Sequence, residues 1–320
     1  MTSPEAAGAG TGDGRGSVQE DVQGQVSLPR TQSGSQPQNL LMTLLGDYWH
    51  GRTEHVPSAA LVALLEEFGI SPFAARAALS RLTRRGVLES SRTGRRTHYR
   101  LSTQPSAAAA LDQGMRRITS FATASRPWDG TWRVVIFSVP EERRDVRHAA
   151  RGRLRWLGFA PLYDGVWICP HDREAEAVGA LASLGVRQYT SMTAQVPPSS
   201  PQGLAPIEAW DLARLRARYD EFVTTWEAML ERVRGGALRE DEALPVRTEL
   251  MYSWLYFPSL DPELPAELLP ADWPRARAYE VFAELYDALG PLAESRVRGI
   301  IARFAPELAP LVRYHPHQGP

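Results

Sequence analysis

Apolar positions recur at helical spacing in three successive segments near the start of the folded part of the chain. They predict helices over residues 40–46, 58–68 and 71–85. The third segment has Ser71 in the N-cap position and Pro72 at its first helical position, which are residue types that begin helices. Three short helices are therefore expected in succession.

Alternating apolar and polar positions follow the third helix. Residues 87–89 and 97–101 predict two strands, with Gly94 in the turn between them. Three helices followed by a hairpin is the order of elements in a winged helix-turn-helix domain. We expect that domain over residues 38–104.

A second pattern of strands and helices begins further along the chain. It comes after a connecting helix at 111–121 and a linker, which belong to a segment spanning residues 105–127. The order strand, helix, strand, strand, helix, strand predicts a ferredoxin-like (βαββαβ) central domain over residues 128–196. The expected elements are strands at 132–137, 159–163, 166–169 and 186–189, and helices at 141–157 and 173–184.

Helical spacing dominates the rest of the chain, and residues 204–320 predict a helical C-terminal domain. Tyr219, Phe222 and Trp226 recur at helical spacing, which favours an ordinary core stripe over the lining of an aryl-ligand pocket. The whole chain is thus predicted to be an α+β multi-domain protein. The expected C-terminal helices lie at 211–234, 244–257, 275–289 and 294–304.

The composition of the chain predicts a disordered N-terminal tail and a cytoplasmic location. Residues 1–37 are rich in Gly, Ser, Gln, Thr and Pro with few large apolar side chains, so they predict a disordered tail. There is no apolar stretch of about 20 residues and no signal segment, so a cytoplasmic protein without a membrane partner is expected. The single cysteine, Cys169, lies in an apolar strand and predicts a buried, inert thiol.

The positive charge of the chain is concentrated in one segment. The net charge is −1, and all 36 basic residues are arginine, whose planar fork suits phosphate and guanine edges. Residues 40–101 hold nine of these arginines against five acidic residues, which gives a local excess of positive charge. A solvated basic face on a three-helix domain would explain part of this excess. The recurrence of arginine on the third helix and again at the hairpin turn favours contact with DNA instead.

The third helix and the hairpin turn supply the candidate DNA-binding residues. We expect Arg76, Ser80 and Arg81 to reach base edges in the major groove. The expected assembly is a homodimer on double-stranded DNA with an inverted-repeat operator, its half-sites about one helical turn apart. The remaining candidates, expected to hold the register and the phosphates, are Ser71, Arg84, Arg85, Arg92, Arg95 and Arg96.

Several short motifs, in this order, resemble the PaaX-type family of bacterial transcriptional repressors. The resemblance implies a repressor of aromatic-acid catabolism genes such as those for phenylacetate, released from its operator by an aryl-CoA thioester such as phenylacetyl-CoA. It also implies that the central domain is similar in fold to the small endoribonucleases of CRISPR adaptation, and that the helical domain over residues 204–320 serves effector binding and dimerisation. The motifs are TLLGDY at 43–48, RAALSRL at 76–82, YRL at 99–101, WRVVIF at 132–137, DPELP at 261–265 and DWP at 272–274.

That likeness raises an enzymatic alternative, a metal-dependent nuclease in the central domain. Such an enzyme needs a carboxylate at the end of the first strand, and this strand ends without one. Asp129 and Asp145 lie nearby but outside that position, so we expect no catalytic residue, metal or cofactor. His315 and His317 form a pair at the C-terminus that favours a frayed tail over a metal site.

Overall fold

The computed structural model describes residues 37–123, 127–195 and 205–317. The tail predicted for residues 1–37 lies outside these ranges except for Pro37, which begins the first helix. Within the described ranges, no helix has both the length and the apolar character needed to span a bilayer. The three described stretches correspond to three packed units, which are taken in turn below.

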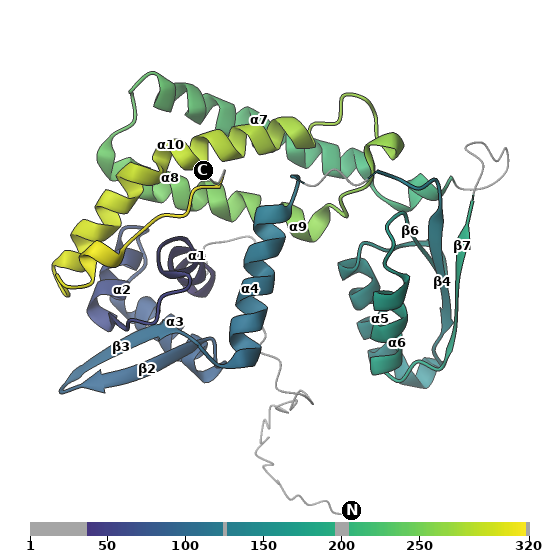
Figure 1. Ribbon diagram of the computed structural model, residues 1–320, viewed down its shortest axis with the longest axis horizontal. Coiled ribbons are helices and arrows are strands. Elements are labelled where there is room, and N and C mark those ends of the chain that lie inside the picture. The colour runs from purple at the N-terminus through teal and green to yellow at the C-terminus, as the bar shows by residue number, and fades with distance from the viewer. Residues whose placement is uncertain (1–36, 124–126, 196–204, 318–320) are drawn as a thin grey trace, which may run out of the picture.

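The N-terminal unit consists of three helices and a three-stranded antiparallel sheet in the order β1-β3-β2 (Figure 1). The three helices and the hairpin were expected from the apolar pattern. The pattern does not predict β1, whose two residues form a strand only because Val56 pairs with Tyr99 of β3. The elements are α1 (Pro37–Trp49), β1 (Val56–Pro57), α2 (Ser58–Glu66), α3 (Pro72–Arg84), β2 (Leu88–Thr93) and β3 (Arg96–Leu101).

Helix α4 (Pro105–Ser120) leads out of this unit and starts well before the predicted residue 111. Proline suits the first turn of a helix and alanine is the strongest helix former, so the segment that the sequence pattern treats as a boundary is already helical. Leu111 packs against the core of the N-terminal unit, whereas Phe121, just past the end of α4, is buried in the core of the C-terminal helices. The connecting helix therefore joins two cores.

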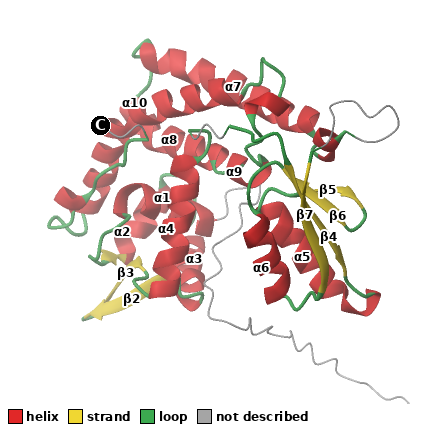
Figure 2. Ribbon diagram, turned by 45° about the vertical axis from the view of Figure 1, so that its right-hand side comes forward, coloured by secondary structure: helices red, strands yellow, loops and turns green. Residues whose placement is uncertain are grey.

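The central unit is a four-stranded antiparallel sheet in the order β5-β6-β4-β7. Helices α5 and α6 both cover one face of this sheet (Figures 1 and 2). The order of elements is the predicted one. The elements are β4 (Trp132–Ser138), α5 (Arg144–Trp156), β5 (Ala160–Tyr163), β6 (Val166–Cys169), α6 (Glu174–Ser183) and β7 (Gln188–Ala194).

Strand β7 differs from its predicted position at 186–189. It pairs with the whole of β4, from Gln188 opposite Ser138 to Ala194 opposite Trp132. Its residues are mostly polar and exposed, so the apolar alternation that identifies the other strands is missing. Backbone pairing with β4, a long-range interaction, decides where this strand lies.

The C-terminal unit contains α7 (Leu212–Arg234), α8 (Glu240–Trp254), α9 (Phe257–Leu260) and α10 (Arg275–Ala302). The prediction of two helices at 275–289 and 294–304 is wrong, because α10 runs through Pro291 without a break. Proline removes one backbone hydrogen bond from a helix. Here the turns on both sides of it are buried in the core, so tertiary packing holds the axis together.

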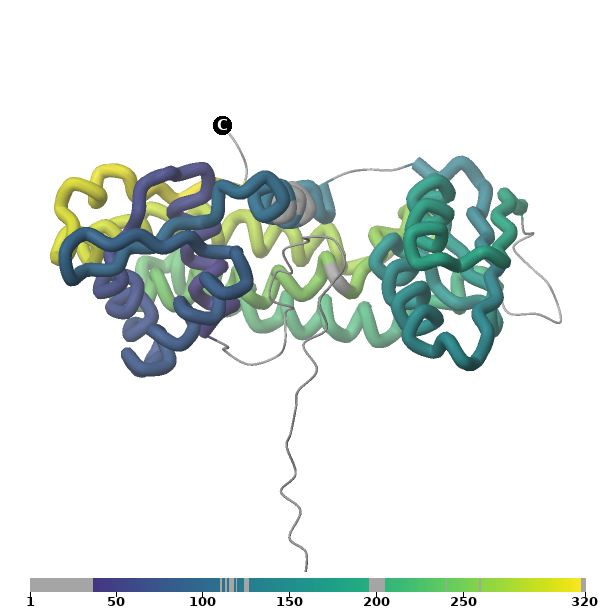
Figure 3. Tube along the Cα trace, turned by 90° about the horizontal axis from the view of Figure 1, so that it is seen from below, coloured from purple at the N-terminus to yellow at the C-terminus, as the bar shows by residue number. Residues whose placement is uncertain are grey.

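The helices α7, α8 and α10 form a bar from which the other two units extend (Figures 1 and 3). The N-terminal unit packs under one end, where Leu244 of α8 and Val297 and Ile300 of α10 enter the same apolar core as α1, α2 and α3. The central unit has its own core and lies at the other end, where Trp132 of β4 stacks on Trp210 just before α7. The N-terminal unit is thus anchored by burial of shared apolar surface.

Candidate nucleic-acid interface

Helix α3 has one buried and one exposed face. Ala75, Ala78, Leu79 and Leu82 are fully buried against the rest of the N-terminal unit. This packing orients the helix, because apolar residues at helical spacing fall on one side of it. The predicted contact residues Arg76, Ser80, Arg81 and Arg84 are all exposed on the remaining surface.

The start of α3 is set by a side-chain cap. The hydroxyl oxygen of Ser71 accepts a hydrogen bond from the amide of Ala74 at 3.3 Å, and Pro72 occupies the first helical turn. The predicted site residue Ser71 is exposed and acts as the N-cap of the helix. At the other end of α3 the amide of Arg85 donates to the carbonyl of Arg81 at 3.1 Å, so Arg85 lies at the C-cap.

The hairpin of β2 and β3 extends away from the body of the molecule (Figure 1). Thr93 pairs with Arg96, so the loop between the strands has two residues, and its first residue, Gly94, has a φ of +62°. This left-handed conformation is readily adopted by glycine. The remaining loop residue is Arg95, and the predicted arginines 92, 95 and 96 are all exposed at this end of the hairpin.

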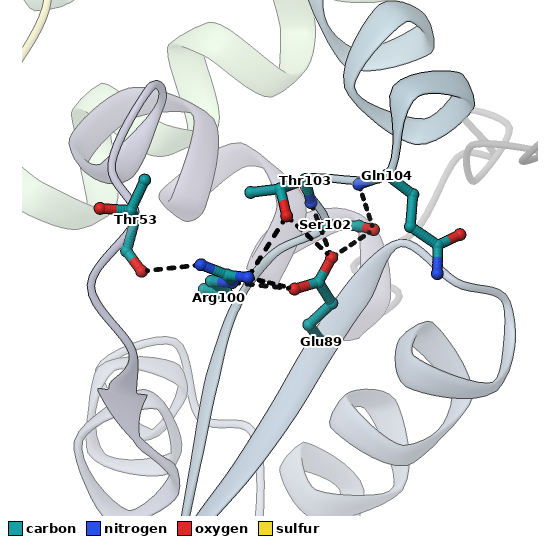
Figure 4. Close-up of polar contacts among 6 residues, drawn as sticks. All are labelled: Thr53, Glu89, Arg100, Ser102, Thr103 and Gln104. Carbon is teal, nitrogen blue, oxygen red and sulfur yellow. Dashed lines mark hydrogen bonds and ion pairs between the residues drawn. The ribbon is translucent and has the colours of Figure 1, made fainter.

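The base of the hairpin is joined to the segment that leads into α4 by a polar network around Glu89 (Figure 4). Arg100 donates to one carboxylate oxygen of Glu89 through Nε at 2.9 Å and Nη2 at 2.6 Å. The other oxygen accepts from the Thr103 amide at 2.8 Å and from the Ser102 hydroxyl at 3.0 Å. Arg100 also donates to the carbonyl of Thr53, so the network joins β2, β3 and the segments on either side of them.

Burial alone would favour the protonated form of Glu89. The hydrogen bonds from Arg100, Thr103 and Ser102 outweigh it and lower the pKa of Glu89 to about 2. The carboxylate is therefore ionised at neutral pH and holds Arg100 at the base of the hairpin. Arg100 belongs to the basic segment identified in the sequence, but in the folded protein its guanidinium is paired with Glu89.

The six arginines at 76, 81, 84, 92, 95 and 96 differ from Arg100. Across the three described stretches, no carboxylate lies within ion-pair distance of any of them. Elsewhere in the same ranges arginines are commonly paired, as Arg234 is with Glu231 and Glu284. The exposed face of α3 and the tip of the hairpin thus each carry positive charge without an acidic partner among the described residues, which suits phosphate groups.

One exposed residue of α3 is apolar, so an analysis of charge alone misses it. Phe73, at the second position of α3, has 83% of its surface exposed. The signal was available in the sequence, since Phe73 is out of phase with the apolar positions that face the core. An apolar residue out of phase on an otherwise polar helix face is informative when it adjoins candidate contact residues.

The N-terminal unit is joined to the C-terminal helices through a buried ion pair. Arg247 of α8 has no exposed surface, and its Nη1 lies 3.3 Å from Oδ2 of Asp47 in α1. The other oxygen of Asp47 accepts from the Tyr286 hydroxyl at 2.7 Å, and Arg247 also donates to the Tyr48 hydroxyl and to the carbonyl of His315. Burial raises the pKa of Asp47, while Arg247 and Tyr286 oppose that shift.

A second junction is formed by the DPELP motif. Asp261 is buried and accepts from the Tyr219 hydroxyl at 2.6 Å and from Nε of Arg275 at 2.7 Å. The next residue, Pro262, has its carbonyl 3.0 Å from Nε2 of His171 in the central unit, and a carboxylate oxygen of Glu263 accepts from the amide of Ala122. This short segment therefore contacts α7, α10, the central unit and the end of α4.

The structure shows the surroundings of the two acidic residues considered for a nuclease in the central unit, and of its cysteine. Asp129 is bound to Arg133 at 2.8 Å and to Thr131, and these hydrogen bonds hold the pKa of Asp129 well below its usual range. Asp145 is exposed on α5. Burial raises the pKa of Cys169 to about 11, so it is an unreactive thiol at neutral pH. The described residues contain no group of three His, Cys, Asp or Glu side chains placed to hold a metal ion.

The frayed tail expected at the C-terminus is wrong for residues 315–317. The ring of His317 packs edge-on against Phe282 and Tyr279, and its amide donates to Asp287 at 2.7 Å. Burial lowers the pKa of His317. The interpretation failed because an aromatic face on α10, which is far away in sequence, provides the packing partner.

Three family descriptions match the chain in sequence order. They are "PaaX-like protein" over residues 36–105, "PaaX protein central Cas2-like domain" over 125–203 and "PaaX-like protein C-terminal domain" over 210–299. The chain belongs to the PaaX family. The transcriptional repressor PaaX of Escherichia coli (strain K12) is 27% identical over 266 residues, which cover 80% of this chain and 81% of that protein.

The fold also has a counterpart among solved structures. An uncharacterized protein from Mycobacterium tuberculosis superimposes with a TM-score of 0.52 at 24% sequence identity. The match covers 81% of this chain and 97% of that one, so the similarity extends over nearly the whole architecture of the PaaX-like chain. At this level of sequence identity the match shows a similarity of fold alone.

Proposed function

We propose that this PaaX-family chain is a DNA-binding transcriptional repressor that acts in the cytoplasm and is not an enzyme. The observation that carries the proposal is the set of six exposed arginines on α3 and at the hairpin tip, which have no carboxylate partner among the residues described. A related protein named as a transcriptional repressor supports the same role. Positive charge gathered on one unit of a chain whose net charge is −1 fits a polyanionic partner.

The N-terminal unit, residues 38–104, is interpreted as a winged helix-turn-helix domain. In this arrangement α3 enters the major groove, where Arg76, Ser80 and Arg81 contact base edges. Phosphates are held by Arg84 and Arg85 at the end of α3 and by the arginines of the hairpin. Ser71 caps α3 and directs its first amides toward the backbone of the duplex.

The other units are assigned supporting roles. Residues 105–127 connect the domains, residues 128–196 form the ferredoxin-like domain, and residues 204–320 form the effector and dimerisation domain. A homodimer would place two copies of α3 on an inverted repeat about one helical turn apart. The core that the N-terminal unit shares with α8 and α10 supports this assignment, because a ligand that moved the C-terminal helices would disturb the packing of α1.

The effector is proposed to be an aryl-CoA thioester, and the regulated genes those of aromatic-acid catabolism such as phenylacetate catabolism. A ligand shifts an equilibrium only by its differential affinity for two states. The buried pair of Arg247 and Asp47 is placed to couple such a shift to DNA binding, since it joins α8 to α1. Phenylacetyl-CoA is the effector to test first.

The test is a gel-shift titration of the protein on DNA from upstream of its own gene, run over a salt series with excess unrelated duplex. We expect a discrete, competitor-resistant shift that phenylacetyl-CoA weakens. Arg81→Ala should relax sequence preference, whereas Arg95→Ala should weaken all sequences and reduce the salt slope by about 1. Arg277→Ala, an exposed arginine paired with Glu227 on the distant helices, is the matched control and should bind as the parent does.

Three outcomes would contradict parts of this proposal. Absence of a shift on any duplex at low salt would rule out the DNA role. A shift that phenylacetyl-CoA leaves unchanged would rule out that effector but not the repressor. Degradation of the probe when magnesium is added would replace the repressor with a nuclease, which is the alternative raised by the fold of the central unit.

A further inference from the structure

Phe73 is the most exposed large apolar side chain in the described part of the chain, at 83%. The exposed residues that follow it along α3 include Arg76, Ser80 and Arg81, which are polar. Isolated apolar residues on a protein surface are common and need no partner. The position of Phe73 within the contact face of α3 distinguishes it from such residues.

Helical spacing aligns Phe73 with the predicted base-contacting residues. Residues three, four and seven positions apart lie on the same face of a helix, so Phe73 shares a face with Arg76 and Ser80. All three are exposed, and the opposite face of α3 is buried. Phe73 also lies in the first turn of the helix, and in helix-turn-helix proteins the N-terminal residues of the recognition helix contact base edges.

We propose that Phe73 is a specificity-determining residue that packs against the 5-methyl group of a thymine in the major groove. This inference rests on the proposed function, because it requires α3 to lie in that groove. The thymine methyl is the apolar group that base pairs present in the major groove, and an aromatic side chain is one of its recurrent partners. The arginines that follow it on α3 supply the attraction to DNA, and Phe73 selects a thymine next to the base that Arg76 contacts.

The alternative occupant of this position is another protein surface, including a second copy of the chain. Charge decides between the two. The residues that share the face of Phe73 are Arg76, Ala77 and Ser80, none of them acidic, and no carboxylate among the residues described neutralises Arg76. Two copies of such a face would repel each other, whereas a duplex carries the complementary charge.

The test replaces the methyl group and the ring separately. The wild-type protein first selects a duplex from a randomised pool, and each thymine of that duplex is then changed to uracil, which removes only the methyl group. We expect one position per half-site at which uracil weakens wild-type binding about fourfold, the value of one buried methyl-sized group. Phe73→Ala should bind the thymine duplex more weakly and lose this discrimination, so that thymine and uracil bind alike.

Two controls keep the result interpretable. Tyr163→Ala removes an exposed aromatic side chain on β5 of the central unit, at 52% exposure, and should retain the thymine preference. Because Phe73 is so exposed, Phe73→Ala should unfold at the same urea concentration as the wild type, which excludes a folding defect.

The outcomes separate this inference from the proposal on which it rests. Failure to select any duplex would contradict the proposed function itself. A selected duplex whose thymine-to-uracil changes affect the wild type and Phe73→Ala equally, or affect neither, would overturn the role of Phe73 alone. A Phe73→Ala variant that binds DNA normally but changes from dimer to monomer would assign the ring to a protein interface instead.

Discussion

The Arg247→Met substitution tests whether the buried ion pair holds the N-terminal unit to the C-terminal helices. Arg247 has no exposed surface, and besides Asp47 its guanidinium contacts Tyr48, Tyr286 and the carbonyl of His315. Methionine retains much of the volume but removes the charge and all of these donors. Breaking a buried pair by removing one partner costs about 3–5 kcal/mol, because the other charge is left uncompensated.

The assay is urea unfolding followed by tryptophan fluorescence over a range of pH. In the variant, burial favours protonated Asp47 without opposition from Arg247, so its pKa should be raised further above the usual value. The folded state then binds more protons than the unfolded state, and stability should fall as pH increases from acid toward neutral. The wild type, with the pair intact, should show a weaker decrease over the same interval.

The double variant Asp47→Asn with Arg247→Met provides the control. It removes both charges, so its loss of stability should be clearly smaller than the sum of the two single losses. A loss below about 1 kcal/mol for Arg247→Met would refute the reasoning, since it would equal that of an ordinary surface ion pair. A double variant whose loss of stability equals the sum of the two single losses would refute it as well.

Two further predictions concern the hydrogen-bond network of Glu89 and the packing at Gly290. Glu89→Gln should destabilise the wing-like hairpin most at neutral pH. The folded pKa of about 2 lies below the ordinary 4.5, so the contribution of Glu89 is complete above the latter and is lost as pH falls toward the former. Unfolding midpoints of the two proteins should therefore converge over this interval, and a constant difference would argue against the network. Gly290→Ala should destabilise by about 1–3 kcal/mol, because a Cβ there would overlap the ring of Tyr314. Thermal unfolding measures this, with Gly299→Ala, which faces open space, as the control; no difference between the two would contradict the packing.

Local sequence was sufficient for much of the candidate interface. Ser71, Pro72 and Gly86 mark the ends of α3 because capping and backbone conformation depend on neighbouring residues alone. The apolar period of α3 likewise determines which side is buried, and so which arginines remain exposed. The order of strands and helices in the central unit follows from the same short-range patterns.

Tertiary structure decided what depends on residues distant in the chain. Strand β1 exists only because β3 pairs with it, and α10 continues through Pro291 because both sides of the proline are buried. Asp47 and Arg247 are 200 positions apart, so no periodicity could have paired them. Periodicity and capping are local properties that a sequence displays directly. Partners brought together by packing are decided by the whole fold, which is why the attachment of the N-terminal unit emerged only from the structure.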